Sequence, residues 1–287
     1  MTLAVLAGVS AATVVAIRNY RGARSLFEAN PPSELLASPE RTGIAGLKTV
    51  SFTSRDRLKL LAWYVPSTNG AAVILAHGTN SDRSTMLSTL RVLSGAGYGV
   101  LAFDWPGLGM SEGSIRWDGQ ARRALTAAID WLSTQSDVDP RRIGGLGFSI
   151  GGFVMTQVAA QDPRLRAVVL EAPPSNFDDY IQVHYTRWGI LGEWPARWAM
   201  RDSGLLDAAT EPSNLVDKIA PRPVLILGGS LDREVPSALV RKLYDTARDP
   251  KALWIVPGAG HGDYPDVAAT EYARRLTDFF AHGLLAQ

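Results

Sequence analysis

Hydrophobic residues along this chain form short continuous runs that alternate with segments of helical periodicity. The runs lie at 71–76, 98–103, 143–148, 167–170, 223–228 and 252–256, and the helical patterns at 83–95, 118–134, 150–161, 236–247 and 267–284. Continuous runs of this kind are typical of strands that are buried on both faces of a parallel sheet. The pattern therefore predicts a doubly wound, mostly parallel α/β domain.

Two earlier segments have a different pattern, in which apolar and polar residues alternate. They span residues 48–53 and 58–65, and Arg55, Asp56 and Arg57 lie between them. Alternation over this length is typical of half-buried strands, and the short polar link suits a turn. We expect an antiparallel hairpin at the start of the sheet.

The alternation of hydrophobic runs and helical patterns stops between residues 171 and 221, where no strand pattern occurs. The segment is rich in aromatic residues, namely Phe177, Tyr180, Tyr185, Trp188, Trp194 and Trp198. A long insertion in a compact domain has either its own structure or a function. We therefore expect an insertion at 175–221 between the two parts of the core, 47–174 and 222–287.

Residues 1–24 form a separate segment, followed by a connector at 25–46. No charged residue occurs from Leu3 to Ile17, whereas Arg18, Arg21 and Arg24 follow directly. As a helix this apolar run would be about 22 Å long, compared with roughly 30 Å for the hydrocarbon core of a bilayer. We expect a helix that either anchors the chain to a membrane through residues 1–17, or packs on the domain or on a second subunit of a homodimer. The arginines would keep the rest of the chain on the cytoplasmic face.

Composition removes several classes of function. The 287 residues carry 29 basic and 28 acidic side chains, scattered along the chain, so the pattern offers no basic surface for nucleic acid. Without cysteine there is no disulfide, no thiolate nucleophile and no cysteine-ligated metal. We expect an activity that needs neither a metal nor an organic cofactor.

The sequence Gly147-Phe148-Ser149-Ile150-Gly151 stands between a predicted strand and a predicted helix. In this G-x-S-x-G context a sharp turn exposes the serine hydroxyl, and small flanking residues let the backbone fold back without a clash. The motif predicts Ser149 as a nucleophile.

A serine nucleophile needs a base, for which histidine is suited. The candidates are His77, His184, His261 and His282. His261 lies in a glycine-rich loop after a predicted strand, where active-site residues of such sheets belong, so we predict it as the base. We interpret His77 and His282 as structural, and His184 as a packing residue that could also contact substrate.

The base in turn needs a carboxylate. Asp232 follows the predicted strand at 223–228 and completes the chain order Ser, Asp, His. Glu171 at the end of the preceding strand is the alternative. Asp263 is close to His261 in sequence, which leaves it little reach to the outer ring nitrogen.

Acyl transfer also needs N–H donors for the developing oxyanion. Ile150 follows the nucleophile at the start of a helix, and the second donor is expected in the loop after the run 71–76. In that loop Thr79 follows a glycine and is the preferred donor, with Asn80 as the alternative.

These motifs occur together in one order: His77-Gly78, 104–111, 147–151, 229–236 and 260–262. In this the chain resembles the α/β-hydrolase-fold serine hydrolases (esterases and lipases) over about residues 47–285, and it is most similar to their Bem46-like branch. The resemblance implies that the insertion is a small helical lid and that the loop from Asp104 is a structural turn.

The predicted activity is hydrolysis of carboxylic esters through an acyl-enzyme. An aromatic lid favours an apolar small-molecule ester, and the candidate substrate contacts are Tyr185, Trp188, Trp194 and Trp198. An amidase or peptidase, or a thioesterase, with the same triad is the nearest alternative. A non-catalytic binding protein on the same fold is an alternative of another class.

Overall fold

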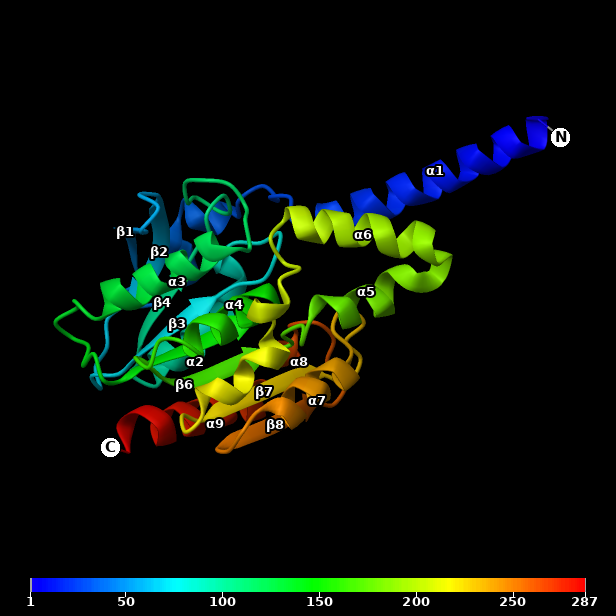
Figure 1. Ribbon diagram of the computed structural model, residues 1–287. Helices are drawn as coiled ribbons and strands as arrows, with labels where there is room; N and C mark the ends of the chain where they lie inside the picture. The colour runs from blue at the N-terminus through cyan, green and yellow to red at the C-terminus, as the bar shows by residue number, and fades with distance from the viewer. Residues whose placement is uncertain (1, 287) are drawn as a thin grey trace.

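The computed structural model describes residues 2–286, with side chains from residue 9 onward. A sheet of eight strands lies at the centre, in the order β1-β2-β4-β3-β5-β6-β7-β8 (Figure 1). The strands are β1 (Lys48–Thr53), β2 (Lys59–Val65), β3 (Ala72–Ala76), β4 (Gly99–Phe103), β5 (Ile143–Phe148), β6 (Leu165–Glu171), β7 (Val224–Gly229) and β8 (Lys251–Val256). The hairpin β1–β2 is antiparallel, β2 also pairs antiparallel with β4, and the other neighbours are parallel. The predicted fold class is confirmed.

Helices cover both faces of this sheet (Figure 1). They are α2 (Leu87–Gly95), α3 (Gly119–Leu132), α4 (Ile150–Ala159), α7 (Ser237–Thr246), α8 (Tyr264–Val267) and α9 (Ala269–Phe280). α3 packs against α4, and α2 packs against α9. α9 begins two residues after the start of the helix predicted at about 267–284, because Ala268 leaves the helical conformation (φ −134°, ψ 41°) and separates α8 from α9. A π-helical turn, Ala281–Leu285, continues α9.

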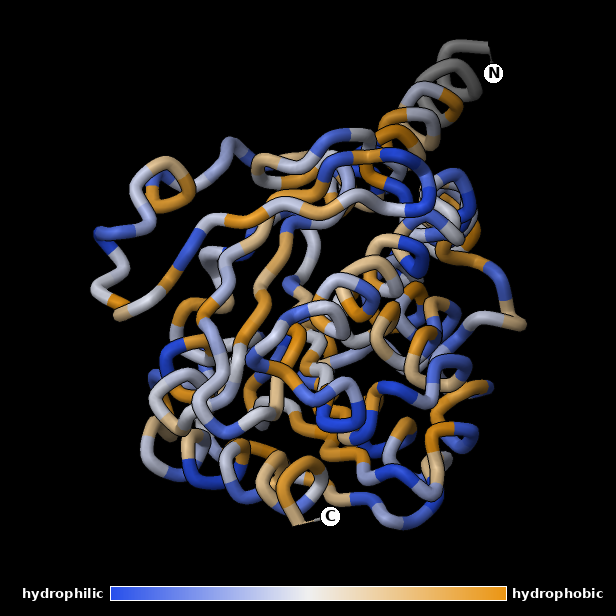
Figure 2. Tube along the Cα trace, turned by 90° about the vertical axis from the view of Figure 1, so that its left-hand side faces the viewer, coloured by the Kyte–Doolittle hydropathy of each residue, from blue (hydrophilic) through white to orange (hydrophobic). Residues whose placement is uncertain are grey.

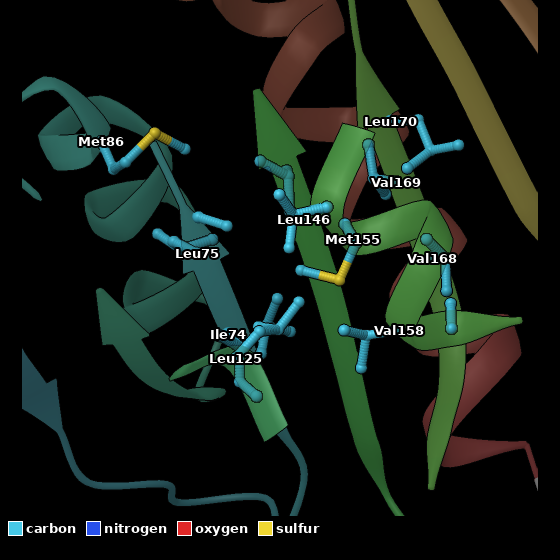
Figure 3. Packing of buried hydrophobic residues seen from close by; sticks show 14 of the residues in the cluster. Ile74, Leu75, Met86, Leu125, Leu146, Met155, Val158, Val168, Val169 and Leu170 are labelled. Carbon is cyan, nitrogen blue, oxygen red and sulfur yellow. The ribbon is translucent and has the colours of Figure 1, made fainter. Parts of the chain in front are cut away.

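The core lies where the continuous hydrophobic runs meet the apolar faces of the helices. Figure 3 shows Ile74 and Leu75 of β3, Leu146 of β5, and Met155 of α4 among the packed side chains of this core. All four side chains are fully buried. Since strands buried on both faces need apolar residues at every position, the runs predicted the central strands to within one or two residues.

The segment after β6 contains two helices, α5 (Phe177–Tyr185) and α6 (Ile190–Asp202), which extend away from the sheet (Figure 1). Asn176 caps α5 by accepting a hydrogen bond from the Asp179 N–H at 2.7 Å. Three short 3-10 turns lead from α6 to β7.

The N-terminal helix α1 (Thr2–Ser25) lies beside α6 and projects beyond the body of the molecule (Figures 1 and 2). Ala23 of α1 is buried against Ala196 and Ala199 of α6. These small side chains let the two helices approach closely. Within the described residues, no helix combines the length and the apolar character that crossing a bilayer requires.

Candidate active site

Ser149 lies at the turn between β5 and α4, in a conformation that few residues adopt. Its φ of 53° and ψ of −120° are strained for a residue with a Cβ. The Ser149 N–H donates to the carbonyl of Glu171 at 2.8 Å, which holds the turn against the neighbouring strand β6. The sheet thus fixes the strained backbone that exposes the hydroxyl.

The two glycines of the motif are required by close packing. A Cβ on Gly151 would lie 2.1 Å from the carbonyl oxygen of Ala76, and a Cβ on Gly147 would lie 2.4 Å from that of Gly151. Both contacts are with backbone atoms, which cannot rotate away. Only glycine therefore lets α4 start this close to β3 and β5.

His261 and Asp232 form a hydrogen-bonded pair in the loops after β8 and β7. The distance from His261 Nδ1 to Asp232 Oδ2 is 2.8 Å. The other carboxylate oxygen of Asp232 accepts the backbone N–H groups of Glu234 and Val235, at 2.8 and 2.9 Å. Because the Asp232 side chain is fully buried, these bonds fix its orientation toward His261.

A cavity of about 270 Å³ brings Ser149 and His261 together. Its walls also include Thr79, Asn80 and Ile150 from the turns after β3 and β5. The remaining lining residues are Leu26, Phe27, Pro174, Phe177, Tyr180, Glu234 and Val235. The predicted nucleophile, base and N–H donors thus meet at the carboxyl edge of the parallel strands, with the predicted acid behind the base.

The backbone N–H groups of Thr79 and Ile150 are suited to bind an anion. Neither has a hydrogen-bond acceptor among residues 2–286, and Ile150 is the first residue of α4, where helix N–H groups are unpaired. The preceding Gly78 lies so close that a Cβ there would be 3.1 Å from the Phe148 ring. This packing holds the Thr79 loop beside the serine turn.

Asn80, the alternative donor, connects the Thr79 loop to the segment after α1. Its side-chain amide donates to the carbonyl of Ser25 at 2.8 Å, and its own carbonyl accepts from the side chain of Asn30. Since its φ is 52°, these two bonds hold a strained residue in place. Asn80 therefore positions the loop.

Glu171, the alternative acid, has a different partner. The Tyr272 hydroxyl donates to Glu171 Oε1 at 2.7 Å, and burial raises the pKa of this carboxyl to about 7. Asp263 accepts the Gly260 N–H at 2.7 Å within its own loop. Neither carboxylate is hydrogen-bonded to His261, whereas Asp232 is.

His77 and Asp104 support the loops around the cavity. Buried His77 bonds to the Gly78 carbonyl and to the Trp105 N–H, and burial lowers its pKa, so the ring is neutral. Asp104 forms a fully buried ion pair with Arg83 and also accepts the Arg83 and Met110 N–H groups. No sequence pattern indicated the Arg83 contact, because a single arginine before a helix is most often exposed.

The four aromatic residues predicted to contact substrate lie outside this cavity. Trp188, Trp194 and Trp198 are 54%, 71% and 67% exposed, and Tyr185 is half-buried. Trp194 and Trp198 line a separate groove between α6 and α1. The aromatic residues that reach the cavity are instead Phe177 and Tyr180, from the first turns of α5.

Other residues of the cavity were missed from the sequence. Glu234 is two positions after Asp232, which was a usable signal, and its carboxylate lies 3.4 Å from the Tyr180 hydroxyl. Leu26 and Phe27 come from the connector, where nothing in the pattern indicated a role. Among the residues that the structure describes, no cluster of three acidic or histidine side chains is arranged to hold a metal.

Comparison with known proteins assigns the chain to a family. The model of the prolyl oligopeptidase family matches residues 83–286. The uncharacterized protein Rv2307c of Mycobacterium tuberculosis is 36% identical over 221 residues, which are 75% of this chain and 73% of that protein. The uncharacterized protein YfhR of Escherichia coli K12 is 30% identical over 250 residues, covering 84% and 82%. The solved Pyrococcus furiosus esterase Pf2001 has the same fold (TM-score 0.73, 24% identity, covering 90% of this chain and 100% of that one).

Proposed function

Since the chain belongs to the prolyl oligopeptidase family and has the fold of an α/β-hydrolase, we propose that it cleaves carboxylic esters through a Ser149–His261–Asp232 triad. The observation that carries this proposal is the His261–Asp232 hydrogen bond beside a cavity that Ser149 also lines. A buried carboxylate held by two N–H groups orients the imidazole and stabilises the imidazolium that forms during the reaction.

In the proposed acylation step, Ser149 Oγ attacks the ester carbonyl carbon while His261 Nε2 takes the hydroxyl proton. The carbonyl oxygen becomes an oxyanion and accepts the N–H groups of Ile150 and Thr79. The intermediate then collapses, the C–O bond to the alcohol breaks, and His261 returns the proton to the leaving alkoxide.

Deacylation repeats these steps with water as the nucleophile. His261 takes a proton from water, the resulting hydroxide attacks the acyl carbon, and the proton returns to Ser149 Oγ. The carboxylic acid leaves, and no cofactor takes part in either half of the cycle.

The charge and the volume of the cavity favour a small substrate that is uncharged or cationic. Glu234 is the only charged side chain among its described lining residues apart from the titratable His261, and no arginine or lysine lines it. A substrate with its own carboxylate or phosphate would meet repulsion from Glu234. The volume of about 270 Å³ is just below the usual range of ligand pockets, roughly 300–1,000 Å³, which favours short acyl groups.

The test is hydrolysis of p-nitrophenyl esters of increasing chain length by the wild-type protein and by Ser149→Ala. Alanine tolerates the Ser149 backbone as well as serine does, since both carry one Cβ, so the variant is expected to fold. We expect wild-type activity that is highest on short esters and a loss of at least about 10³-fold in the variant. Equal rates for the two proteins would overturn the proposal.

Peptide hydrolysis is a second candidate, favoured by the family match itself. The same triad would serve, because only the leaving group changes from alkoxide to amine. An aminoacyl p-nitroanilide and a thioester, assayed beside the esters, rank the three bond types by kcat/KM. No turnover of any of them would favour a non-catalytic binding protein.

A further inference from the structure

A groove separate from the Ser149 cavity lies between α1 and α6. Its volume is about 700 Å³, and its walls include Ile17, Tyr20, Trp194, Trp198, Arg201 and Leu206. Tyr20 and Trp198 contact each other across it, with ring centroids 5.3 Å apart. The proposed ester hydrolysis uses none of these residues.

Large apolar side chains are exposed along both helices of this groove. Ile190, Trp194 and Trp198 recur every four residues and therefore share one face of α6. On α1, Val14 and Ile17 are exposed. Soluble monomers rarely expose such a contiguous apolar surface, and where they do it is a binding surface.

Positive charge accompanies these apolar side chains. Residues 2–25 and 186–202 contain six arginines and only two acidic residues, whereas the whole chain has a net charge of +1. Arg24 pairs with Asp202, and Arg197 pairs with Glu193 and Asp178. The other four arginines (Arg18, Arg21, Arg187 and Arg201) are exposed and form no ion pair within residues 2–286.

We propose that the face formed by α1 and α6 docks onto a bilayer surface that contains anionic phospholipid, with both helices at the level of the headgroups. Tryptophan is amphipathic and favours this level of a membrane, while unpaired arginines bind lipid phosphates. Each arginine near an anionic membrane strengthens binding by about 1 kcal/mol, or roughly fivefold.

A second copy of the chain fits this face less well. A symmetric dimer would bring the same patch of each subunit together, so the unpaired arginines of one would oppose those of the other. Anionic lipid neutralises this charge instead. The proposal does not depend on the triad, because docking is measured without turnover.

The test is cosedimentation of the full chain with vesicles of phosphatidylcholine alone and with vesicles that also contain phosphatidylglycerol. We expect much stronger binding to the anionic vesicles. Trp194→Ala/Trp198→Ala should weaken that binding at least about tenfold, since two large apolar surfaces are lost. Arg18→Gln/Arg201→Gln should weaken it roughly 25-fold, and only on anionic vesicles.

Matched controls change exposed residues elsewhere. Met110→Ala/Val267→Ala removes two exposed apolar side chains, and Arg57→Gln/Arg241→Gln removes two exposed arginines. Both should bind vesicles as the wild type does. Binding that is insensitive to the α1 and α6 variants would overturn the proposal. The proposal would also be overturned if the wild type were a dimer that does not bind vesicles and if Trp194→Ala/Trp198→Ala were a monomer. That result would assign the face to a second copy of the chain.

Discussion

Individual side chains at the carboxyl edge of the sheet have separable roles, and the two buried carboxylates are the clearest example. Asp232 bonds to His261, whereas Glu171 bonds to Tyr272. In Asp232→Asn the amide favours the wrong imidazole tautomer, so we expect kcat to fall on the order of 10⁴-fold. Glu171→Gln keeps an oxygen for the Tyr272 hydroxyl and should stay within about tenfold of wild type on the same ester. The reverse ranking would assign the acid role to Glu171.

The tryptophans show why residue roles are hard to assign from sequence. Their number in the insertion led to the prediction that they contact substrate, but which face of a helix meets the cavity depends on where the helix packs. In the structure α6 packs against α1, so Trp194 and Trp198 turn toward the groove with Tyr20. That contact joins segments about 180 residues apart, which no local pattern predicts.

At the scale of elements, two loops of the site depend on one buried ion pair. Arg83 precedes α2, and Asp104 follows β4. Arg83→Met leaves Asp104 buried without its cation, and we expect unfolding free energy to fall by about 3–5 kcal/mol. Arg83→Met/Asp104→Asn should recover part of this loss, because asparagine carries no charge and its oxygen still accepts one of the two backbone N–H groups.

Urea unfolding of these two variants tests the pair, with Arg164→Met as the control. Arg164 forms partly exposed ion pairs with Asp130 and Asp162. Replacing Arg164 by methionine should lower the unfolding free energy by no more than about 1 kcal/mol. A similar cost for Arg83→Met would show that the buried pair adds nothing beyond a surface one.

The connector after α1 should affect catalysis although it carries no catalytic residue. Asn30 donates to the carbonyl of Asn80, next to the proposed oxyanion donor Thr79. Asn30→Ala frees this loop, so we expect kcat on a short ester to fall roughly tenfold, with KM nearly unchanged. Asn19→Ala, which removes a side-chain bond inside α1, is the control. A loss in both variants alike would contradict a positioning role.

Elements differed in how well their sequences predicted them. The strand 143–148 was predicted to the residue, because a buried parallel strand needs an apolar residue or glycine at every position. The role of residues 25–30 was not predictable, since polar connector residues acquire partners only through tertiary packing. That Ser149 and His261 would line one cavity was anticipated from strand ends, whereas Tyr180 and Glu234 depended on how α5 lies over the cavity.

For the whole molecule, the buried Glu171 links stability to pH. Burial raises its pKa from an ordinary value near 4.5 to about 7, so the folded state holds this proton more tightly than the unfolded chain. The resulting stabilisation is complete below about pH 4.5 and is lost as pH rises to about 7. Between these two pH limits, the contribution of Glu171 to the unfolding free energy changes by about 3 kcal/mol.

Urea unfolding of wild type and Glu171→Gln at pH 5 and pH 8 measures this link. We expect the variant to gain stability relative to wild type at pH 8, because glutamine cannot ionise. Other titrating groups contribute to both proteins and cancel in the comparison. An identical pH dependence for the two proteins would contradict the raised pKa.

The cavity beside Ser149 takes its walls from almost the full length of the chain, from Leu26 and Phe27 to His261. During synthesis at about 5–20 residues per second, roughly 10–50 s separate the emergence of Phe27 from that of His261. Most of the sheet can form in that interval, but the cavity cannot close. A nascent chain therefore stays without hydrolytic activity until its last few elements have been made, and the onset of activity marks the end of folding.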